Sequence, residues 1–465
     1  MERITSEVSE NKQLLGRASV FRMYQQSIKR QVLDVIRDVF ETVLSQALKD
    51  EIVDVLGRGR GQRRNLSDIS KVKATCNDCH SSERRNFYRG GSYSRTLLTG
   101  PALVDVRVPR LSCVCGGSVS LQFALFSRHQ RVWFDLQERA RQLSGLCLSL
   151  RDSIEVLAAE NGQRLAIGTI NGLVNETAAL AEAFRKGPLA MIPAVVLLDG
   201  LWVKELEDTD RQYTDKRGQC RLRKRRHKRP ILVAYGIDPL TAEKRLLDWE
   251  KGQEEDQESW QRLLERLEER GLRAEKGLKL FVHDGSAGLE AAFAMVDFGV
   301  GVRRQRCVFH KLRNVAKAVQ GEDGMSRKEK QQRRKEVVKA AAAVYVGTDR
   351  AEIEAHLKAF GEKWREREPE AVLTLERGFE ATIVYLDVLA EARKDDEEWS
   401  VRHLRTTSAL ERVNRALRQK FRQVVIFHSD QGLEAAIQLV IAHRGLAGES
   451  KESWVDAIEE ALKAA

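Results

Sequence analysis

The sequence predicts a mixed α/β core with helical segments on either side of it. Three apolar stretches typical of strands follow one another at 190–206, 229–238 and 243–252, and the turn sequence GIDP separates the last two. Helical and strand patterns then alternate from 256 to 310. Hairpin-linked strands followed by helix–strand alternation predict one sheet with both antiparallel and parallel pairs.

The later elements follow from periodicity and from punctuating glycines. A helical pattern at 256–271 ends on a glycine, and strands are expected at 278–284 and 301–310, the second running into a helix. Residues 311–406 are typical of charged helices, and 407–464 of a helix, a short loop and a helix. Helices therefore separate the sheet from the C-terminal segment.

The first part of the chain has a different character. Apolar residues at three- and four-residue spacing predict amphipathic helices over 18–56, and a basic, glycine-rich joint follows at 58–65. Residues 71–126 carry cysteines and strand-like pieces. Two helices joined by a turn at Asn161-Gly162 are expected within 146–185, which is typical of a helix-turn-helix or, alternatively, of a simple packed helical pair.

Charge suggests a polyanionic partner. The 465 residues include 79 Lys and Arg against 68 Asp and Glu, a net charge of +11, and nine of the fourteen residues at 216–229 are basic. Clustered positive charge favours DNA or RNA, although a basic enzyme without such a partner has a similar composition. No apolar run reaches 18 residues and the N-terminus has no signal-peptide pattern, so we expect a cytoplasmic protein that does not bind membranes.

Four of the seven cysteines form two close pairs. Cys76 and Cys79 are separated by two residues, and Cys113 and Cys115 by one. Two such pairs commonly supply the thiolates of a tetrahedral zinc site, whereas the tight second pair is less common in such sites. The alternatives are a structural Zn²⁺ site and reduced cysteines without metal.

Two aspartates are expected at strand ends, where open α/β sheets bind ligands. Asp199 should end the first strand and Asp284 the fourth, and each is followed by glycine. Carboxylates there could bind Mg²⁺, with Glu411 as a third ligand. Each acid also has a structural interpretation: a polar strand end for Asp199, a helix N-cap for Asp284 and a capping box with Ser408 for Glu411.

Three motifs around these acids resemble, in order, those of prokaryotic insertion-sequence transposases of the Mutator-like superfamily. They are VHDGSAGLEAAF, QRCVFHKLRNV and LRTTSALERVNRALRQKFR. The stretches LLDGLWVKEL and FGEKWREREPEAV also resemble segments of that family. The likeness covers about 146–440.

The resemblance implies a DDE transposase with a ribonuclease-H-like core and a helical insertion. Asp199, Asp284 and Glu411 would hold two ions of Mg²⁺ or Mn²⁺, and a zinc-bearing module would help to hold DNA. The implied domains are a helical region at 1–65, a Cys₄ zinc-binding β module at 66–130, a helix-turn-helix-like region at 131–188, the first part of the core at 189–310, the insertion at 311–405 and the rest of the core at 406–465.

Further residues take roles from these motifs or from their charge. The C-x-x-H pair Cys307 and His310 is interpreted as a structural or DNA-positioning element, because no second ligand pair follows it. The other motif residues are Arg313, Asn314, Arg412 and Asn414. The expected DNA contacts are Arg223, Lys224, Arg225, Arg226, Lys228 and Arg229, and after Glu411 also Arg415, Arg418, Lys420 and Arg422.

The expected activity is cleavage at inverted repeats of the element and joining of the 3′-OH to target DNA. A dimer or larger homo-oligomer assembled on DNA is expected, associated with the nucleoid. Two alternatives are a catalytically silent DNA-binding regulator derived from a transposase and a metal-dependent nuclease of the same fold.

Overall fold

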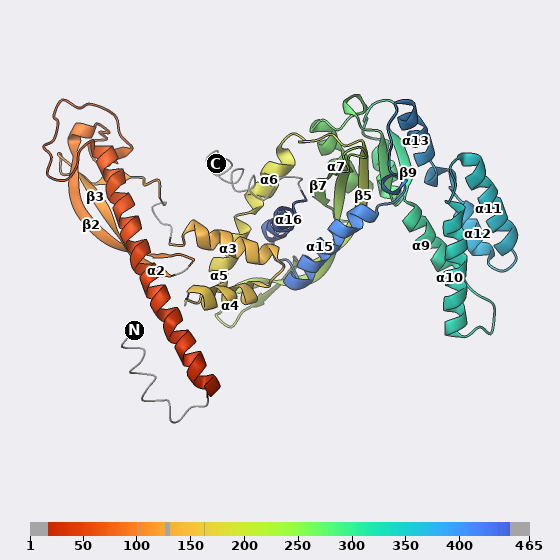
Figure 1. The fold of residues 1–465 in the computed structure, drawn as a ribbon, viewed down its shortest axis with the longest axis horizontal. Helices are drawn as coiled ribbons and strands as arrows, with labels where there is room; N and C mark the ends of the chain where they lie inside the picture. The colour runs from red at the N-terminus through yellow and green to blue at the C-terminus, as the bar shows by residue number, and fades with distance from the viewer. Residues whose placement is uncertain (1–16, 101, 126–130, 162, 447–465) are drawn as a thin grey trace. The chain divides into compact units, whose positions relative to one another are not determined.

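The computed structural model describes residues 17–446 except 101, 126–130 and 162 (Figure 1). The ends of the predicted first and last segments, 1–16 and 447–465, therefore lie outside the described residues. The chain forms two compact units, Met1–Ser144 with Ser149–Val174 and Gly145–Leu148 with Asn175–Ala465. None of the described helices is long and apolar enough to cross a lipid bilayer.

The first unit is built on one long helix. The helices predicted over 18–56 are a single 40-residue helix, α2 (Arg17–Leu56), because no glycine or proline interrupts the segment. Its second half packs through Leu44 and Leu48 on a hairpin of β2 (Phe87–Leu98) and β3 (Leu103–Cys113). The short strands β1 (Ala74–Cys76) and β4 (Val119–Leu121) form a second antiparallel pair.

The predicted helix-turn-helix consists of more pieces than expected. After α3 (Phe134–Gly145), α4 (Leu150–Asn161) ends at the predicted turn and α5 (Ile167–Asn175) follows it. The second helix does not continue to 185, because a turn at Glu176 and Thr177 interrupts it before α6 (Ala178–Lys186). The hydroxyl of Thr177 instead donates to the carbonyl of Ala435, at 3.5 Å.

The second unit contains a mixed five-stranded sheet in the order β7-β6-β5-β8-β9, which confirms the mixed α/β prediction (Figure 1). The first three strands pair antiparallel, and β5–β8 and β8–β9 pair in parallel. The strands are β5 (Val195–Thr214), β6 (Cys220–Ile237), β7 (Lys244–Lys251), β8 (Leu280–His283) and β9 (Arg303–Arg306).

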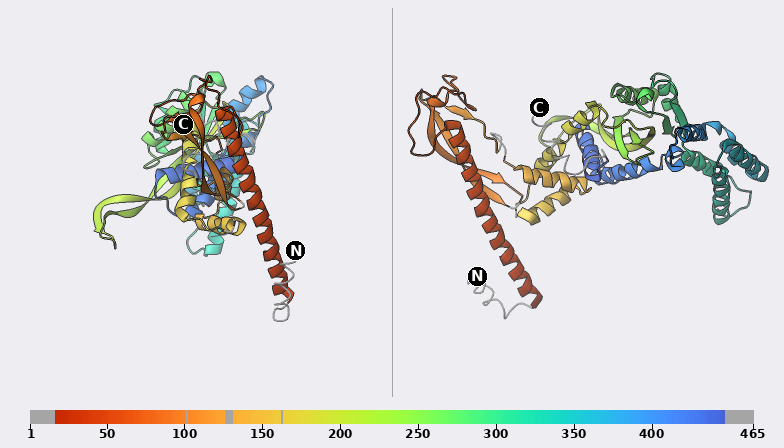
Figure 2. Two further views of the ribbon diagram at one scale, coloured as in Figure 1. Left: turned by 90° about the vertical axis from the view of Figure 1, so that its left-hand side faces the viewer. Right: turned by 45° about the horizontal axis from the view of Figure 1, so that its top comes forward.

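The first strand is much longer than predicted. It does not end at Asp199 but continues to Thr214, because β6 pairs with it throughout. Since β7 pairs only with 231–237 of β6 and β8 only with 195–197 of β5, the outer part of this hairpin projects beyond the sheet (Figure 2, left). The basic run at 216–229 forms one side of the projection.

Helices cover both faces of the sheet. One face, with Val196 and Leu198, packs on α7 (Gln257–Glu269) and α8 (Ala287–Phe293). The other face, with Leu197 and Val233, packs with α15 (Ser408–Val424) and α16 (Asp430–Arg444). Most of 308–404 is helical, as predicted, in α9 (Val308–Ala318), α10 (Arg327–Val344), α11 (Arg350–Trp364), α12 (Pro369–Glu376), α13 (Tyr385–Lys394) and α14 (Val401–Leu404).

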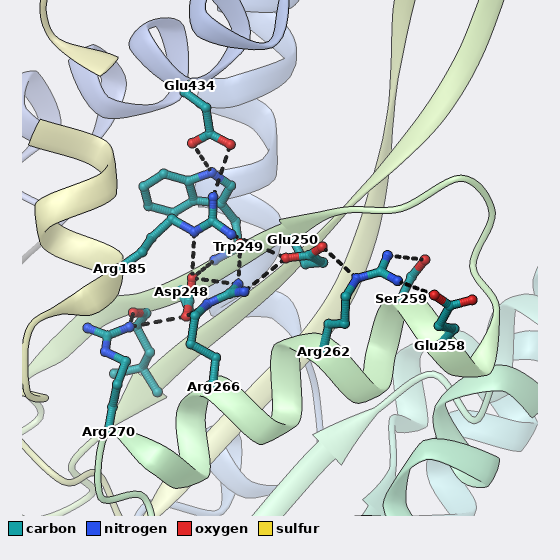
Figure 3. Close-up of polar contacts among 11 residues, drawn as sticks. Arg185, Asp248, Trp249, Glu250, Glu258, Ser259, Arg262, Arg266, Arg270 and Glu434 are labelled. Carbon is teal, nitrogen blue, oxygen red and sulfur yellow. Dashed lines mark hydrogen bonds and ion pairs between the residues drawn. The ribbon is translucent and has the colours of Figure 1, made fainter. Parts of the chain in front are cut away.

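An ion-pair network on β7 joins four elements of this unit (Figure 3). The fully buried carboxylate of Asp248 accepts from Arg266 of α7 at 2.7 Å and from Arg270 at 3.2 Å. Arg185 of α6 approaches the same carboxylate to 3.3 Å. Glu434 of α16 accepts from the indole of the neighbouring Trp249 at 2.8 Å.

Candidate active site

The register of two parallel strands brings the two aspartates together. The β5–β8 pairing ends at Leu197 opposite Val282, and each aspartate lies two residues further along its own strand direction. Asp284 directly follows β8, as predicted, whereas Asp199 lies inside β5. The two carboxylates are close enough for the charge of Asp284 to act on Asp199.

On one side, β5 is not paired with a strand next to Asp199. On the side where β8 pairs up to Leu197, the next neighbour is Phe427, which bridges to Glu205. Between these two points, residues 198–203 have no strand partner on that side among the residues that the structure describes. Asp199 therefore lies in a stretch of β5 that is not paired with a strand on this side.

Burial and charge act on Asp199 in opposite directions. Burial raises the pKa of its carboxyl, and the nearby charge of Asp284 adds to that rise. His310 and Arg418 oppose it by favouring the charged form. The site thus holds like charges close together and places cations around them.

The structural alternatives for Asp284 and Glu411 are wrong. The N-cap of α8 is Ser286, and Asp284 instead accepts from the Ser286 amide at 2.9 Å. Helix α15 begins at Ser408 itself, with Thr407 as N-cap and without a side-chain cap, so no capping box forms. Neither carboxylate is committed to capping a helix.

Glu411 shares a cavity of about 700 Å³ with Asp199, here called the Asp199 pocket. Its lining residues are Asp199, Gly200, His310, Arg313, Glu411, Arg415, Arg418, Gln419 and Arg422. Asp284 does not line this pocket, and the oxygens of the three acids do not all lie within 4.8 Å of one another in the described chain. The structure therefore brings Asp199 to each of the other two acids without forming one tight triad.

Asn414 fixes the orientation of Asp199. Its side chain is fully buried on α15, and its amide nitrogen donates to Oδ2 of Asp199 at 2.9 Å. Because Asn414 follows Glu411 by three residues, both point from the same side of α15. The amide oxygen of Asn414 is buried and forms no hydrogen bond with any described residue.

His310 lines the Asp199 pocket and Cys307 is the N-cap of the same helix, and among the described residues neither belongs to a cluster of three or more side chains that could hold a metal ion. The buried Cys307 thiol accepts from the amide of Thr407 at 3.3 Å, which ties β9 to the start of α15. Interaction with Cys307 raises the pKa of His310, and the charges of Asp199 and Asp284 raise it further. The imidazole therefore favours its charged form beside the carboxylates.

The chain is similar to known proteins over most of its length. The family described as "Transposase, Mutator family" matches residues 12–447. The chain belongs to the Mutator family of transposases.

Its relatives are transposases of insertion sequence elements. It is 27% identical over 424 residues to the transposase for ISRM5 of Rhizobium meliloti, covering 91% of this chain and 89% of that one. It is 26% identical over 407 residues to the transposase for IS406 of Burkholderia multivorans, covering 86% and 92%. The Drosophila P element transposase strand transfer complex matches 66% of this chain and 91% of its own, at 9% identity and a TM-score of 0.39.

A fourth carboxylate of the transposase lies at the site, which sequence reasoning missed. Glu255 precedes α7, and a Cβ on Gly200 would lie only 2.5 Å from its Oε1. Burial raises the pKa of Glu255, and the charges of Asp284 and then Asp199 raise it further. Nothing local distinguishes Glu255 from Glu254 and Asp256 beside it; only the glycine after Asp199 hinted at a close approach.

The basic residues of α15 divide by burial. Arg415, Arg418 and Arg422 line the Asp199 pocket together with Arg313 of α9. Lys420 is only 3% exposed, and burial lowers its pKa to about 8. We therefore exclude Lys420 from the expected DNA contacts, because its amine is not presented to a ligand.

The basic strand of the β5–β6 hairpin carries cations with acidic partners and cations without them. Arg225 and Arg229 both bind Glu207 across the hairpin, at 2.9 and 3.0 Å, and Arg229 is buried. Lys224 lies 3.4 Å from Asp208. Among the described residues, three of the expected DNA contacts on this strand form no ion pair with an acidic side chain; these are Arg223, Arg226 and Lys228.

The four paired cysteines meet in the first unit, as predicted. Sγ of Cys76 lies 3.5 Å from that of Cys115, and Cys79 lies 3.7 Å from Cys113. All four sulfurs lie within 4.8 Å of one another. A tetrahedral site with Zn–S bonds of about 2.3 Å needs sulfurs about 3.8 Å apart, so this group could hold Zn²⁺.

The backbone favours the thiolate of one cysteine of the cluster, whereas burial raises the pKa of Cys113. Amide groups, first that of Cys79, lower the pKa of Cys76 to about 7. The amide of Gly117 approaches Sγ of Cys115 at 3.4 Å, and a Cβ on Gly117 would lie 2.8 Å from Sγ of Cys76. A glycine is therefore required at this position for the loop to fold over the sulfurs.

Proposed function

We propose that this chain is a DDE transposase that binds the terminal inverted repeats of its element, cleaves DNA at the ends and joins the 3′-OH to target DNA. The observation that carries the proposal is the β5–β8 register, which places Asp199 and Asp284 at one sheet edge. Glu411 lies across the Asp199 pocket on a separate helix.

The proposed core is ribonuclease-H-like. Three antiparallel strands followed by two parallel ones, in the order β7-β6-β5-β8-β9, support this assignment. The helices of 311–405 would be the insertion, since they lie between β9 and the helix that carries Glu411.

The donors suit Mg²⁺ or Mn²⁺, because these ions prefer oxygen ligands. Asp199, Asp284 and Glu411 would hold the ions. Burial and the charge of Asp284 both disfavour the ionised form of Asp199, and a bound cation would offset this effect. A bound pair of divalent ions activates the attacking oxygen and neutralises charge on the leaving oxygen.

The chain's own residues bind and orient the DNA. Arg313, Arg415 and Arg418 offer guanidinium groups to phosphates in the Asp199 pocket. Asn414 holds Asp199 in one orientation through its 2.9 Å hydrogen bond. Catalysis of this kind needs positioning and charge stabilisation, and no Ser or Tyr nucleophile.

We also propose that the Cys76 cluster holds structural Zn²⁺ and that its module contacts DNA. The S–S distances of 3.5 and 3.7 Å and the lowered pKa of Cys76 support the zinc site. The clustered charge of the chain, +11 in total, supports a DNA partner.

The test is cleavage and strand transfer on DNA that carries the ends of the element, with Mg²⁺ or Mn²⁺. We expect Asp284→Asn and Glu411→Gln to lose at least about a hundredfold in rate, because charge stabilisation at the reacting phosphate is lost. Glu269→Gln, at an exposed position of α7, is the matched control and should stay active.

Two outcomes would contradict the proposal. A wild-type protein that binds the ends without cutting them would be a silent DNA-binding protein. Cleavage without joining would indicate a nuclease. Full activity in Asp284→Asn would remove the triad assignment alone.

A further inference from the structure

A second cavity lies on the other flank of α15, here called the Arg412 cavity. Its volume is about 450 Å³, and it is formed by β6, the start of β7, α15 and the end of α16. Four of its lining residues are cations, and no acidic side chain lines it. The four are Lys244, Arg412, Arg415 and Arg444.

These cations concentrate positive charge in a concave site. In the part of the chain that the structure describes, none of the four forms an ion pair with an acidic side chain. The nearby His403 responds to this field: its pKa is lowered by burial first and then by Lys244, Arg402 and Arg412. A cleft lined by charge of one sign attracts a counter-charge, and here that charge must be an anion.

The Arg412 cavity continues the Asp199 pocket. Arg415 and Gln419 line both, so α15 forms a shared wall between them. Arg412 and Arg418, one on each side of the wall, are six residues apart, or about 9 Å along the helix axis. That length corresponds to two or three nucleotides at about 3.4 Å each.

The lining suits phosphodiester groups. Guanidinium forks bind phosphate oxygens through paired hydrogen bonds, and three of the four cations are arginines. The hydroxyl-bearing side chain of Tyr235 also lines the cavity and has an apolar environment. A divalent cation or a carboxylic acid side chain of a partner would match this lining less well, the first by charge and the second by its smaller number of acceptors.

We propose that the Arg412 cavity binds a backbone phosphate of the DNA strand that lies in the Asp199 pocket, two or three nucleotides away from the reacting phosphate. This rests on the proposed function, since it takes the Asp199 pocket as the site of the reaction. It adds Lys244, Arg412 and Arg444 to the residues that hold the DNA.

The test measures DNA binding without metal. Fluorescence anisotropy of a fluorescein-labelled duplex, in EDTA and over a series of KCl concentrations, compares wild type with Arg412→Ala/Arg444→Ala. We expect weaker binding and a log–log salt slope that is less steep by about one, because the loss of one phosphate contact removes about 0.9. Circular dichroism melting checks that the variant is folded.

A matched control removes the same charge elsewhere. Arg334→Ala/Lys335→Ala changes two exposed cations of α10 and should leave the slope near that of wild type. An equal change in both double variants, or no change in either, would overturn the proposal. A melting temperature that rises with inorganic phosphate in wild type only, with no change of the DNA slope, would assign the cavity to free phosphate and would also overturn it.

The outcome is separable from the proposed function. Asp284→Asn should bind the duplex with the wild-type salt slope although it cannot cleave. Failure of wild type to cleave would refute the enzyme assignment and leave the slope of Arg412→Ala/Arg444→Ala unaffected.

Discussion

Glu255 can lie at the site because Gly200, which is next to it in space, has no side chain. Gly200 directly follows Asp199 on β5, and its missing Cβ leaves room for the Glu255 carboxylate. The charges of Asp284 and Asp199 both raise the pKa of Glu255, so the three acids repel one another when ionised. Stability of this region is therefore lower than its packing alone would give.

We predict that Glu255→Gln stabilises the metal-free protein and weakens binding of Mn²⁺. Removing one of several like charges relieves repulsion, whereas a cation loses a negative neighbour. The melting temperature in EDTA should rise by a few degrees, and the Kd for Mn²⁺, followed by the electron paramagnetic resonance of the free ion, should increase severalfold.

Glu254→Gln provides the control, because it removes the same charge at an exposed neighbouring position. If both variants shift the melting temperature and the Kd equally, Glu255 has no specific place at the site.

At the scale of elements, Asp248 holds helices on both sides of β7. Its carboxylate is fully buried and faces Arg185, Arg266 and Arg270, which come from α6 and from α7 and its end. A buried charge that loses its partner is costly, so these arginines depend on Asp248. These ion pairs help to hold the helices against the sheet that carries Asp199 (Figure 3).

We expect Asp248→Asn to lower the free energy of unfolding of this unit by about 3 kcal/mol, because Arg270, whose side chain is 6% exposed, loses its counter-charge, whereas Arg185 and Arg266 keep Glu250. Urea unfolding followed by tryptophan fluorescence measures the loss, and Trp249 beside the network reports on it directly.

The comparison variant is Glu258→Ala. Glu258 pairs with Arg262 of the same helix, and its side chain is 83% exposed. Exposed pairs contribute at most about 1 kcal/mol. A loss in Asp248→Asn as small as in Glu258→Ala would show that the network adds little to stability.

At the scale of the whole molecule, the chain consists of two compact units with different sources of stability. The first has small apolar clusters and the cysteine cluster, whereas the second has a sheet covered by helices on both faces. Removal of metal should therefore affect the two units unequally.

We predict two calorimetric transitions, of which a strong zinc chelator lowers only one. The transition of the first unit should move down by well over ten degrees, because structural zinc contributes folding free energy directly. Cys113→Ser should reproduce the effect without chelator, and Cys220→Ser, at an exposed cysteine of the hairpin, should not. A chelator that shifts neither transition would show that the cluster folds without metal.

Much of the fold and part of the site followed from the sequence by itself. Local patterns predicted the strands of the sheet, the helices after them and the two cysteine pairs. Strand and helix periods and short ligand spacings depend only on residues that are close in sequence. The order of the motifs led to the Mutator family, and with it to Asp199, Asp284 and Glu411.

Only the tertiary structure decided what depends on residues distant in sequence. Pairing with β6 extends β5 past Asp199, the β5–β8 register sets Asp199 beside Asp284, and Gly200 admits Glu255. Packing also buries Lys420 while leaving Arg418 and Arg422 of the same helix exposed. Register and burial are set by contacts across the fold, so no local pattern contains them.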